Sequence, residues 1–164
     1  MDTNLDPLAA LRNEHEEIRA VISKLKGYLK KITSASSDEV KNNLINQLNE
    51  ISEFMNKDLE THFKREEDAL FPVLGNYIGI ETGPINVMII EHNHCRDLSS
   101  GFKIKINSYP SDRDYKLLIG TGSSLGQLLS EHEDKEDNIL FNMAEMHLTQ
   151  DEKRDIAEKM QTIN

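Results

Sequence analysis

The stretches HFKREEDALF at residues 62–71 and HEDKEDNILF at residues 132–141 repeat one pattern. In each, a histidine is followed four positions later by a glutamate and then directly by a second acid, and Leu-Phe comes after two further residues. Because an α-helix turns once in about 3.6 residues, the histidine and the glutamate project from the same helix face. The repeat therefore predicts two helices that each carry an imidazole and a carboxylate side by side.

A second motif precedes each of these stretches. Residues 14–19 read EHEEIR and residues 91–96 read EHNHCR, so both contain Glu-His-x-x-x-Arg. The second copy of this motif follows the first by 77 residues, and the histidine–glutamate motif recurs after 70 residues. The chain thus consists of two similar halves, which predicts a bundle with approximate two-fold symmetry.

Hydrophobic periodicity predicts an all-α protein with four long helices. We expect these helices over residues 5–32, 38–74, 84–107 and 112–146. Asp6 and Pro7 are typical of a helix start. Ser111 and Asp114 form a capping-box pattern at the fourth helix, and TQDE at 149–152 opens a short additional C-terminal helix. Long helices joined by short polar loops favour an up-down-up-down four-helix bundle.

Composition and charge exclude several classes of protein. A chain of 164 residues is expected to form one domain, residues 1–164 with a core at about 8–146. The formal net charge of −10 argues against binding to nucleic acid or to anionic membrane surfaces. A lone Cys95, no recognisable signal peptide and no apolar run of about 20 residues predict a cytoplasmic protein.

The neighbours of the histidines indicate that the imidazoles point into the bundle. His15, for example, lies between Leu11 and Ile18 on the apolar stripe of its helix. Unpaired imidazoles and carboxylates in an apolar interior each cost several kcal/mol, and coordination of a cation removes that cost. The candidate metal ligands are His15, His62, Glu66, His92, His132 and Glu136.

The chemistry of these six ligands indicates two metal ions. Nitrogen and oxygen ligands without a thiolate suit iron or manganese better than a closed structural zinc site. Each ion would receive two histidines, and Glu66 and Glu136 would bridge the pair at a metal separation of about 3.5–4 Å. Asp137 is the alternative to Glu136. Glu136 is preferred because a straight helix places Asp137 about 140° around the axis from His132. The same reasoning prefers Glu66 to Glu67.

A metal-free interpretation competes with this one. A single histidine on an apolar helix face is more often a hydrogen-bonded core residue than a ligand, and a single His-x-x-x-Glu pair can be an ordinary surface contact. Two copies of the whole pattern on the inward stripes of consecutive helices argue against coincidence. We therefore favour a metal centre, and we assign no residue a catalytic role.

Residues flanking the motifs have more than one interpretation. Arg19 and Arg96, four positions after a candidate ligand, either neutralise carboxylates near the site or form salt bridges at the bundle periphery. Glu14 and Glu91 are either solvated or hydrogen-bonded behind the ligands.

Five further positions are interpreted structurally. His94 and His147 have no matching counterpart in the other half, so we expect them at the surface. Gly120, Gly122 and Gly126 interrupt the fourth helix, where each costs about 1 kcal/mol relative to alanine. We expect these glycines to permit close approach between helices.

The six candidate ligands in the order H…HxxxE…H…HxxxE resemble the hemerythrin-like family, also called the HHE cation-binding domain. The resemblance covers about residues 8–146 and implies a non-haem di-iron centre, with two Fe ions bridged by two carboxylates and an oxo or hydroxo group. Oxygen-carrying members have HxxxH on the third helix, where this chain has Arg96 instead of the second histidine. His94 points about 200° away from His92 and does not replace it. The set of four histidines and two glutamates is similar to that of the bacterial iron-centre repair proteins, which respond to nitric oxide and oxidative damage.

Three functions are compatible with these patterns. The first is a di-iron protein that binds or senses O₂ or NO reversibly. The second handles iron under oxidative or nitrosative stress with a reductant or iron-acceptor protein as partner, or reacts with peroxide or NO at the same site without being a dedicated enzyme. The third is a metal-free histidine phosphotransfer module, which requires one exposed histidine. The missing fifth histidine favours reactivity towards small diatomic molecules or iron handling over stable O₂ transport.

Overall fold

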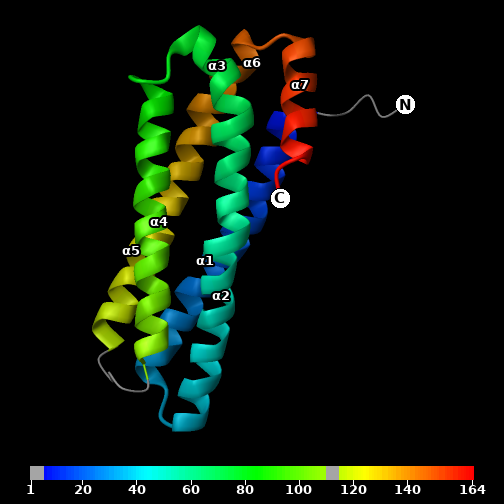
Figure 1. The fold of residues 1–164 in the computed structure, drawn as a ribbon. Helices are drawn as coiled ribbons and strands as arrows, with labels where there is room; N and C mark the ends of the chain where they lie inside the picture. Colours follow the sequence, from blue (N-terminus) through cyan, green and yellow to red (C-terminus); the bar gives the residue numbers. More distant parts are fainter. Residues whose placement is uncertain (1–5, 110–114) are drawn as a thin grey trace.

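The computed structural model describes residues 6–109 and 115–164, and the regular structure within these ranges is helical. Four long helices form the bundle (Figure 1). They are α1 (Pro7–Ser34), α2 (Asp38–Arg65), α4 (Pro84–Ser108) and α5 (Tyr115–Lys135). Each packs against two others in the cyclic order α1, α2, α4, α5, so the expected four-helix bundle is confirmed.

The second and fourth long helices continue through a wider turn into a shorter helix. A π-helical turn, η1 (Glu66–Leu70), joins α2 to α3 (Phe71–Ile78), and a second one, η2 (Glu136–Leu140), joins α5 to α6 (Phe141–His147). The sequence predicted unbroken helices over 38–74 and 112–146, and hydrophobic periodicity gave no sign of these turns. A π turn accommodates one extra residue, and such turns are frequent at functional sites. Here each turn begins at the glutamate of a His-x-x-x-Glu motif.

Capping interactions set the described helix ends. The Asp6 side chain accepts a hydrogen bond from the backbone N–H of Leu8 at 3.0 Å, as expected for the N-cap of α1. Thr149 and Glu152 form the predicted capping box at the start of α7 (Gln150–Gln161). The capping box expected at Ser111 and Asp114 lies outside the described residues.

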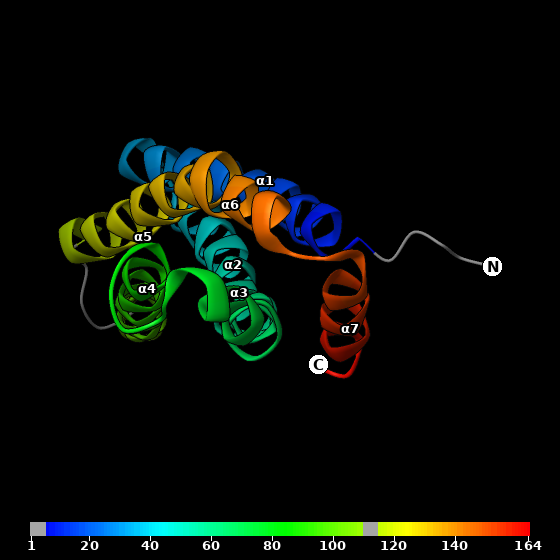
Figure 2. The ribbon, with the colours of Figure 1, turned by 90° about the horizontal axis from the view of Figure 1, so that it is seen from above.

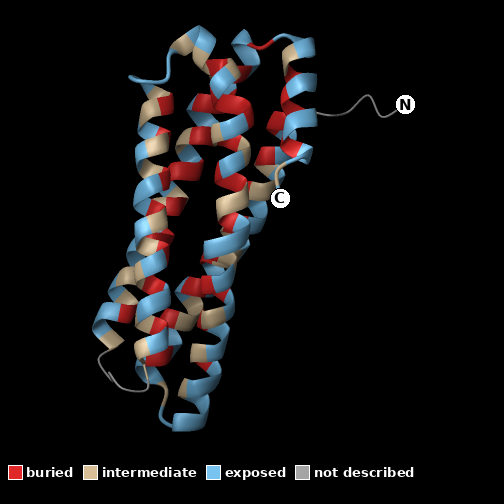
Figure 3. Ribbon diagram, in the orientation of Figure 1, coloured by how far each residue is buried: buried red, intermediate tan, exposed pale blue. Residues whose placement is uncertain are grey.

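The buried residues recur along the helices, on the sides turned towards the other helices (Figure 3). One apolar cluster extends from Ile18 and Phe63 towards the end of the bundle where α1 meets α2. The other contains Leu11, Leu70 and Met88, among others, and lies beneath α3, α6 and α7. Since His15 falls between Leu11 and Ile18 on α1, the histidine motifs occupy the level that separates the two apolar clusters.

The C-terminal helix α7 lies beside the bundle, against α1 and η1 (Figure 2). Ile156, Ala157 and Met160 form its buried face. No counterpart of α7 follows the first half of the sequence, so this helix breaks the two-fold symmetry. Among the described helices, none has the length and apolarity to cross a lipid bilayer.

The three glycines of α5 differ in their surroundings. A Cβ atom on Gly122 would lie 2.8 Å from a methyl carbon of Leu29 and 2.9 Å from the ring of Phe102, so close helix approach is confirmed there. A Cβ atom on Gly126 would make ordinary contacts, the nearest at 3.6 Å. For Gly120 the expectation is wrong, because this residue is exposed and a Cβ atom would meet nothing within 4 Å.

Substitution at two of these glycines should have opposite effects on stability. Gly122→Leu should lower the free energy of unfolding by about 1–3 kcal/mol because the added side chain overpacks the α1–α4–α5 contact. Gly120→Ala should raise it by up to about 1 kcal/mol, because alanine favours the helix and no neighbour is displaced. Urea unfolding followed by circular dichroism measures both. Equal effects of the two substitutions would contradict this account of helix packing.

Candidate metal centre

The six candidate ligands meet at one level of the bundle although they come from six different elements. Their solvent-exposed fractions do not exceed 3%. The side chains form two overlapping groups, His15–His62–Glu66–Glu136 and Glu66–His92–His132–Glu136. Both glutamates belong to both groups, so the arrangement offers places for two metal ions.

Two histidine pairs lie at opposite sides of this cluster. The Nε2 atoms of His15 and His62 are 3.1 Å apart, and those of His92 and His132 are also 3.1 Å apart. Two imidazole nitrogens at this distance with their lone pairs converging suit a cation bound to both. Each long helix of the bundle contributes one histidine.

Glu66 and Glu136 each divide their two oxygens between the histidine pairs. The Oε1 atom of Glu66 lies 3.1 Å from Nε2 of His62, and its Oε2 atom lies 3.1 Å from Nε2 of His92. For Glu136, Oε2 lies 3.1 Å from Nε2 of His15, and Oε1 lies 3.3 Å from Nε2 of His132. This is the placement that a carboxylate needs to bridge two ions.

The four oxygens of Glu66 and Glu136 are buried and have no hydrogen-bond partner among the described residues. Their contacts with the Nε2 atoms fall within ion-pair distance but lack hydrogen-bond geometry. Buried carboxylate oxygens without a directed donor are costly, and a cation supplies what they lack. The residues present therefore fit a pair of bound metal ions.

The same cluster shifts the pKa values of His15 and His132. Burial lowers the pKa of His15, but the hydrogen bond to Asp137 and the adjacent carboxylates of Glu136 and Glu66 outweigh it and raise that pKa to about 12. Burial also lowers the pKa of His132, and the charge of Glu136 raises it to about 10. Because a metal binds the neutral imidazole, cation binding here is coupled to release of protons.

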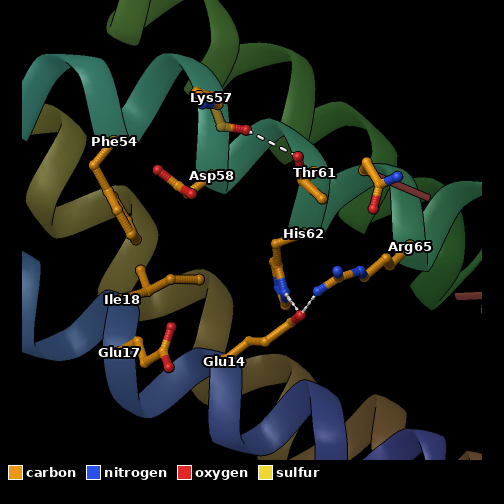
Figure 4. Close-up of a pocket in the computed structure, with 10 residues that line it drawn as sticks. Glu14, Glu17, Ile18, Phe54, Lys57, Asp58, Thr61, His62 and Arg65 are labelled. Carbon is orange, nitrogen blue, oxygen red and sulfur yellow. Dashed lines mark hydrogen bonds and ion pairs between the residues drawn. The ribbon is translucent and has the colours of Figure 1, made fainter. Parts of the chain in front are cut away.

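A carboxylate lies behind His62 and another behind His132. The Nδ1 atom of His62 is 2.7 Å from Glu14, and that of His132 is 2.9 Å from Glu91. Glu14 also contacts the Arg65 guanidinium (Figure 4). In the same way, Glu91 contacts the Lys135 ammonium group. Of the two interpretations open for these glutamates, hydrogen bonding behind the ligands is correct.

The outer nitrogens of His15 and His92 have carboxylate partners from the opposite half of the sequence. The Nδ1 atom of His15 is 2.8 Å from Asp137, and that of His92 is 2.7 Å from Glu67. An Nδ1–H that donates to a carboxylate fixes the tautomer and directs the Nε2 lone pair to the centre. Asp137 is thus a partner of a histidine, and Glu136 is the residue that faces the other ligands.

Arg19 and Arg96 neutralise these supporting carboxylates. Arg19 donates to Asp137 at 2.6 Å, and Arg96 donates to Glu67 at 3.0 Å. The pairing across the halves was missed in the sequence analysis. Its signal is the adjacent acids in Glu66-Glu67 and Glu136-Asp137, of which the first faces the centre and the second supports a histidine from another helix.

Glu133 is a further buried carboxylate that the sequence analysis missed. It is 1% exposed, and neither oxygen has a hydrogen-bond partner among the described residues. Its nearest charged contact is Arg19, whose Nε atom lies 3.3 Å from Oε2. Burial raises the pKa of Glu133 to about 7 against the opposing charges of His15 and Arg19. The only hint in the sequence is an acid directly after the motif histidine His132.

A cavity of about 290 Å³ opens between α1 and α2 beside one histidine pair (Figure 4). Its polar lining is Glu14, Glu17, Lys57, Asp58, Thr61, His62, Arg65 and Asn164. His62 therefore lines a pocket that is open to the surface.

The remaining predicted positions agree with their structural interpretation. His94 and His147 are exposed and lie outside both ligand groups. Cys95 is buried, and burial raises the pKa of its thiol to about 12, so it behaves as a core residue.

A four-helix bundle with two overlapping His/Glu groups at its centre defines a helical cation-binding protein. The model of the family described as hemerythrin HHE cation binding domain matches residues 6–144. The chain belongs to this family, as its motifs predicted.

Relatives of established name match a shorter part of the chain. It is 32% identical over 95 residues to the iron-sulfur cluster repair protein YtfE of Salmonella schwarzengrund. It is 30% identical over 95 residues to the YtfE proteins of Escherichia coli O81 and Escherichia fergusonii. In each case the match covers 55% of this chain and 43% of the relative, so the chain matches less than half the length of these relatives.

Removal of a carboxylate behind a histidine should weaken metal binding. Glu91→Gln should lower the affinity about 10–100-fold, because the amide supports the His132 imidazole less well than a carboxylate does. Glu131→Gln is the matched control, since Glu131 is an exposed acid of α5. It accepts a hydrogen bond from the Gln127 side chain at 3.0 Å. Competition with a metal-binding dye measures both affinities. Equal affinities of the two variants would contradict the supporting role.

Proposed function

We propose that the chain binds two iron ions and uses them to react with O₂ or NO or to handle iron under oxidative or nitrosative stress. The observation that supports this most directly is the division of the Glu66 and Glu136 oxygens between the two histidine pairs. Two carboxylates that each reach both pairs suit two ions better than one.

The ligand set favours iron or manganese over zinc. Four imidazoles and two bridging carboxylates, with no thiolate among them, suit iron or manganese. A closed zinc site would use four ligands on a single ion. When bound, iron supplies redox chemistry and open coordination positions for a small ligand. The protein's own groups hold the ions, fix the imidazole tautomers and exclude bulk water through the surrounding apolar clusters.

The residue in place of a fifth histidine supports an open centre. Arg96 points its guanidinium to Glu60 and Glu67, and its Nε atom donates to Glu60 at 2.7 Å. This side chain is committed to carboxylates outside the ligand groups. One ion therefore keeps fewer protein ligands than in an oxygen carrier, which favours reaction and exchange over reversible O₂ binding. Reversible O₂ binding or sensing is the second candidate function.

The relatives named as iron-sulfur cluster repair proteins favour iron handling. By this proposal a reductant or an iron-acceptor protein of the cytoplasm is the partner, and O₂, NO or peroxide is the small ligand. A histidine phosphotransfer function is disfavoured, because the four motif histidines are at most 3% exposed and have no surface for phosphoryl transfer.

Metal content tests the proposed ligands. The purified chain should contain about two irons, and His62→Ala or Glu136→Ala should lower the iron content sharply because each removes a ligand. His147→Ala is the control, since this exposed histidine lies outside the ligand groups. Elemental analysis gives the stoichiometry, and one equivalent of zinc in place of iron would refute the two-iron site.

Exposure of the reduced protein to gases separates the two candidate functions. The iron-loaded chain is reduced without oxygen and then mixed with O₂ or with NO while its absorption is recorded. Rapid oxidation with release of iron to a chelator is expected for reaction and iron handling. A stable adduct that disappears on removal of the gas would instead support reversible binding.

A further inference from the structure

The two halves of the metal site differ in one buried residue. Positions 63 and 133 correspond, because each directly follows the histidine of a His-x-x-x-Glu motif. Phe63 stacks on the His92 imidazole with ring centres 4.0 Å apart, and Arg96 lies 5.4 Å above the Phe63 ring. In the other half Glu133 takes this place, next to the corresponding arginine. An aromatic ring on one side of the site is thus replaced by a carboxylate on the other.

Glu133 is not satisfied by the protein groups around it. Neither of its oxygens has a hydrogen bond from a described residue, although the side chain is 1% exposed. Arg19 contacts it at 3.3 Å but donates at the shorter distance of 2.6 Å to Asp137. A buried carboxylate in this condition destabilises the fold, and such groups are typically retained where a ligand or ion compensates them.

A surface pocket lies beside the same half of the site. The cavity beside His62 contains Glu17 and Asp58. In the other half, the positions of these acids are occupied by His94 and Leu128. The two halves of the site therefore differ in the acids of the surface beside them.

We propose that Glu133 makes the two metal positions unequal by supporting the cation held between His15 and His62. This inference rests on the proposed two-iron site and adds a residue outside the ligand groups to it. Glu133 is a positioning residue. Its negative charge stabilises a cation at that position, because charges interact strongly in the buried interior where His15, His62 and Glu133 lie. The ion between His92 and His132, which faces Phe63 instead, has no such support.

Retention of metal against a chelator tests the inference. The full chain, its Glu133→Gln variant and its Glu131→Gln variant are loaded with Fe(II) without oxygen, and the ions retained per chain are counted at rising EGTA concentration. The wild type and Glu131→Gln should both retain two ions per chain up to the same EGTA concentration. Glu133→Gln should retain one ion as the wild type does and lose the other at about tenfold lower EGTA concentration.

The stability of the metal-free chain separates this role from a structural one. Glu133→Gln should be at least as stable as the wild type in thermal unfolding, because a neutral amide replaces an unsatisfied buried carboxylate. A lower unfolding temperature with unchanged metal retention would overturn the inference, since Glu133 would then serve only to pair with Arg19.

Two variants that each lack one ligand histidine show which of the two metal positions Glu133 supports. In His132→Ala, which keeps the His15–His62 pair, the Glu133→Gln change should weaken retention of the remaining ion. In His62→Ala it should have no effect, and the opposite result would overturn the assignment. If the wild type and Glu133→Gln both retain two ions to the same EGTA concentration, this inference alone is refuted. A wild type that retains only one ion refutes the two-iron proposal as well.

Discussion

Four carboxylate oxygens buried between two apolar clusters are the constraint on which the site depends. Water does not reach Glu66 and Glu136, and the imidazoles beside them do not donate directed hydrogen bonds. From this centre towards the surface, basic and acidic side chains alternate. The imidazoles contact carboxylates through Nδ1, and those carboxylates contact arginine or lysine side chains near the surface. Each layer compensates the one inside it, so a cation at the centre completes the series.

The supporting contacts also lock the helices together at one level. His15 on α1 depends on Asp137 from η2, and His92 on α4 depends on Glu67 from η1. Each of these acids directly follows a glutamate that faces the centre, and it supports a histidine from another helix. The π turns begin at those glutamates, and Phe141, which follows η2, stacks on His15 with ring centres 5.3 Å apart. Removal of a single contact therefore disturbs the position of a ligand on another helix.

Departures from two-fold symmetry give the two ends of the candidate metal site different surroundings. Two sequence halves with identical motifs would make two equivalent metal positions. Phe63 and Glu133 instead give the two positions different neighbours. The terminal helix α7 adds a further difference, because it packs against α1 and η1 and has no counterpart after the first half. Inequivalent positions suit a protein in which one ion is held while the other exchanges or meets a small ligand.

Much of this protein could be predicted from its sequence. The helical periods, the capping residues Asp6 and Thr149 and the doubled motifs determine an all-α bundle whose six candidate ligands lie on inward stripes, because spacing along a helix fixes which side chains share a face. Spacing does not determine which acid from another helix approaches an imidazole, nor where a helix widens into a π turn. The partners of the histidines and the burial of Glu133 were decided by the packing of the helices, because the histidine contacts join residues 25 to 122 positions apart on different elements and the burial of Glu133 depends on what covers it.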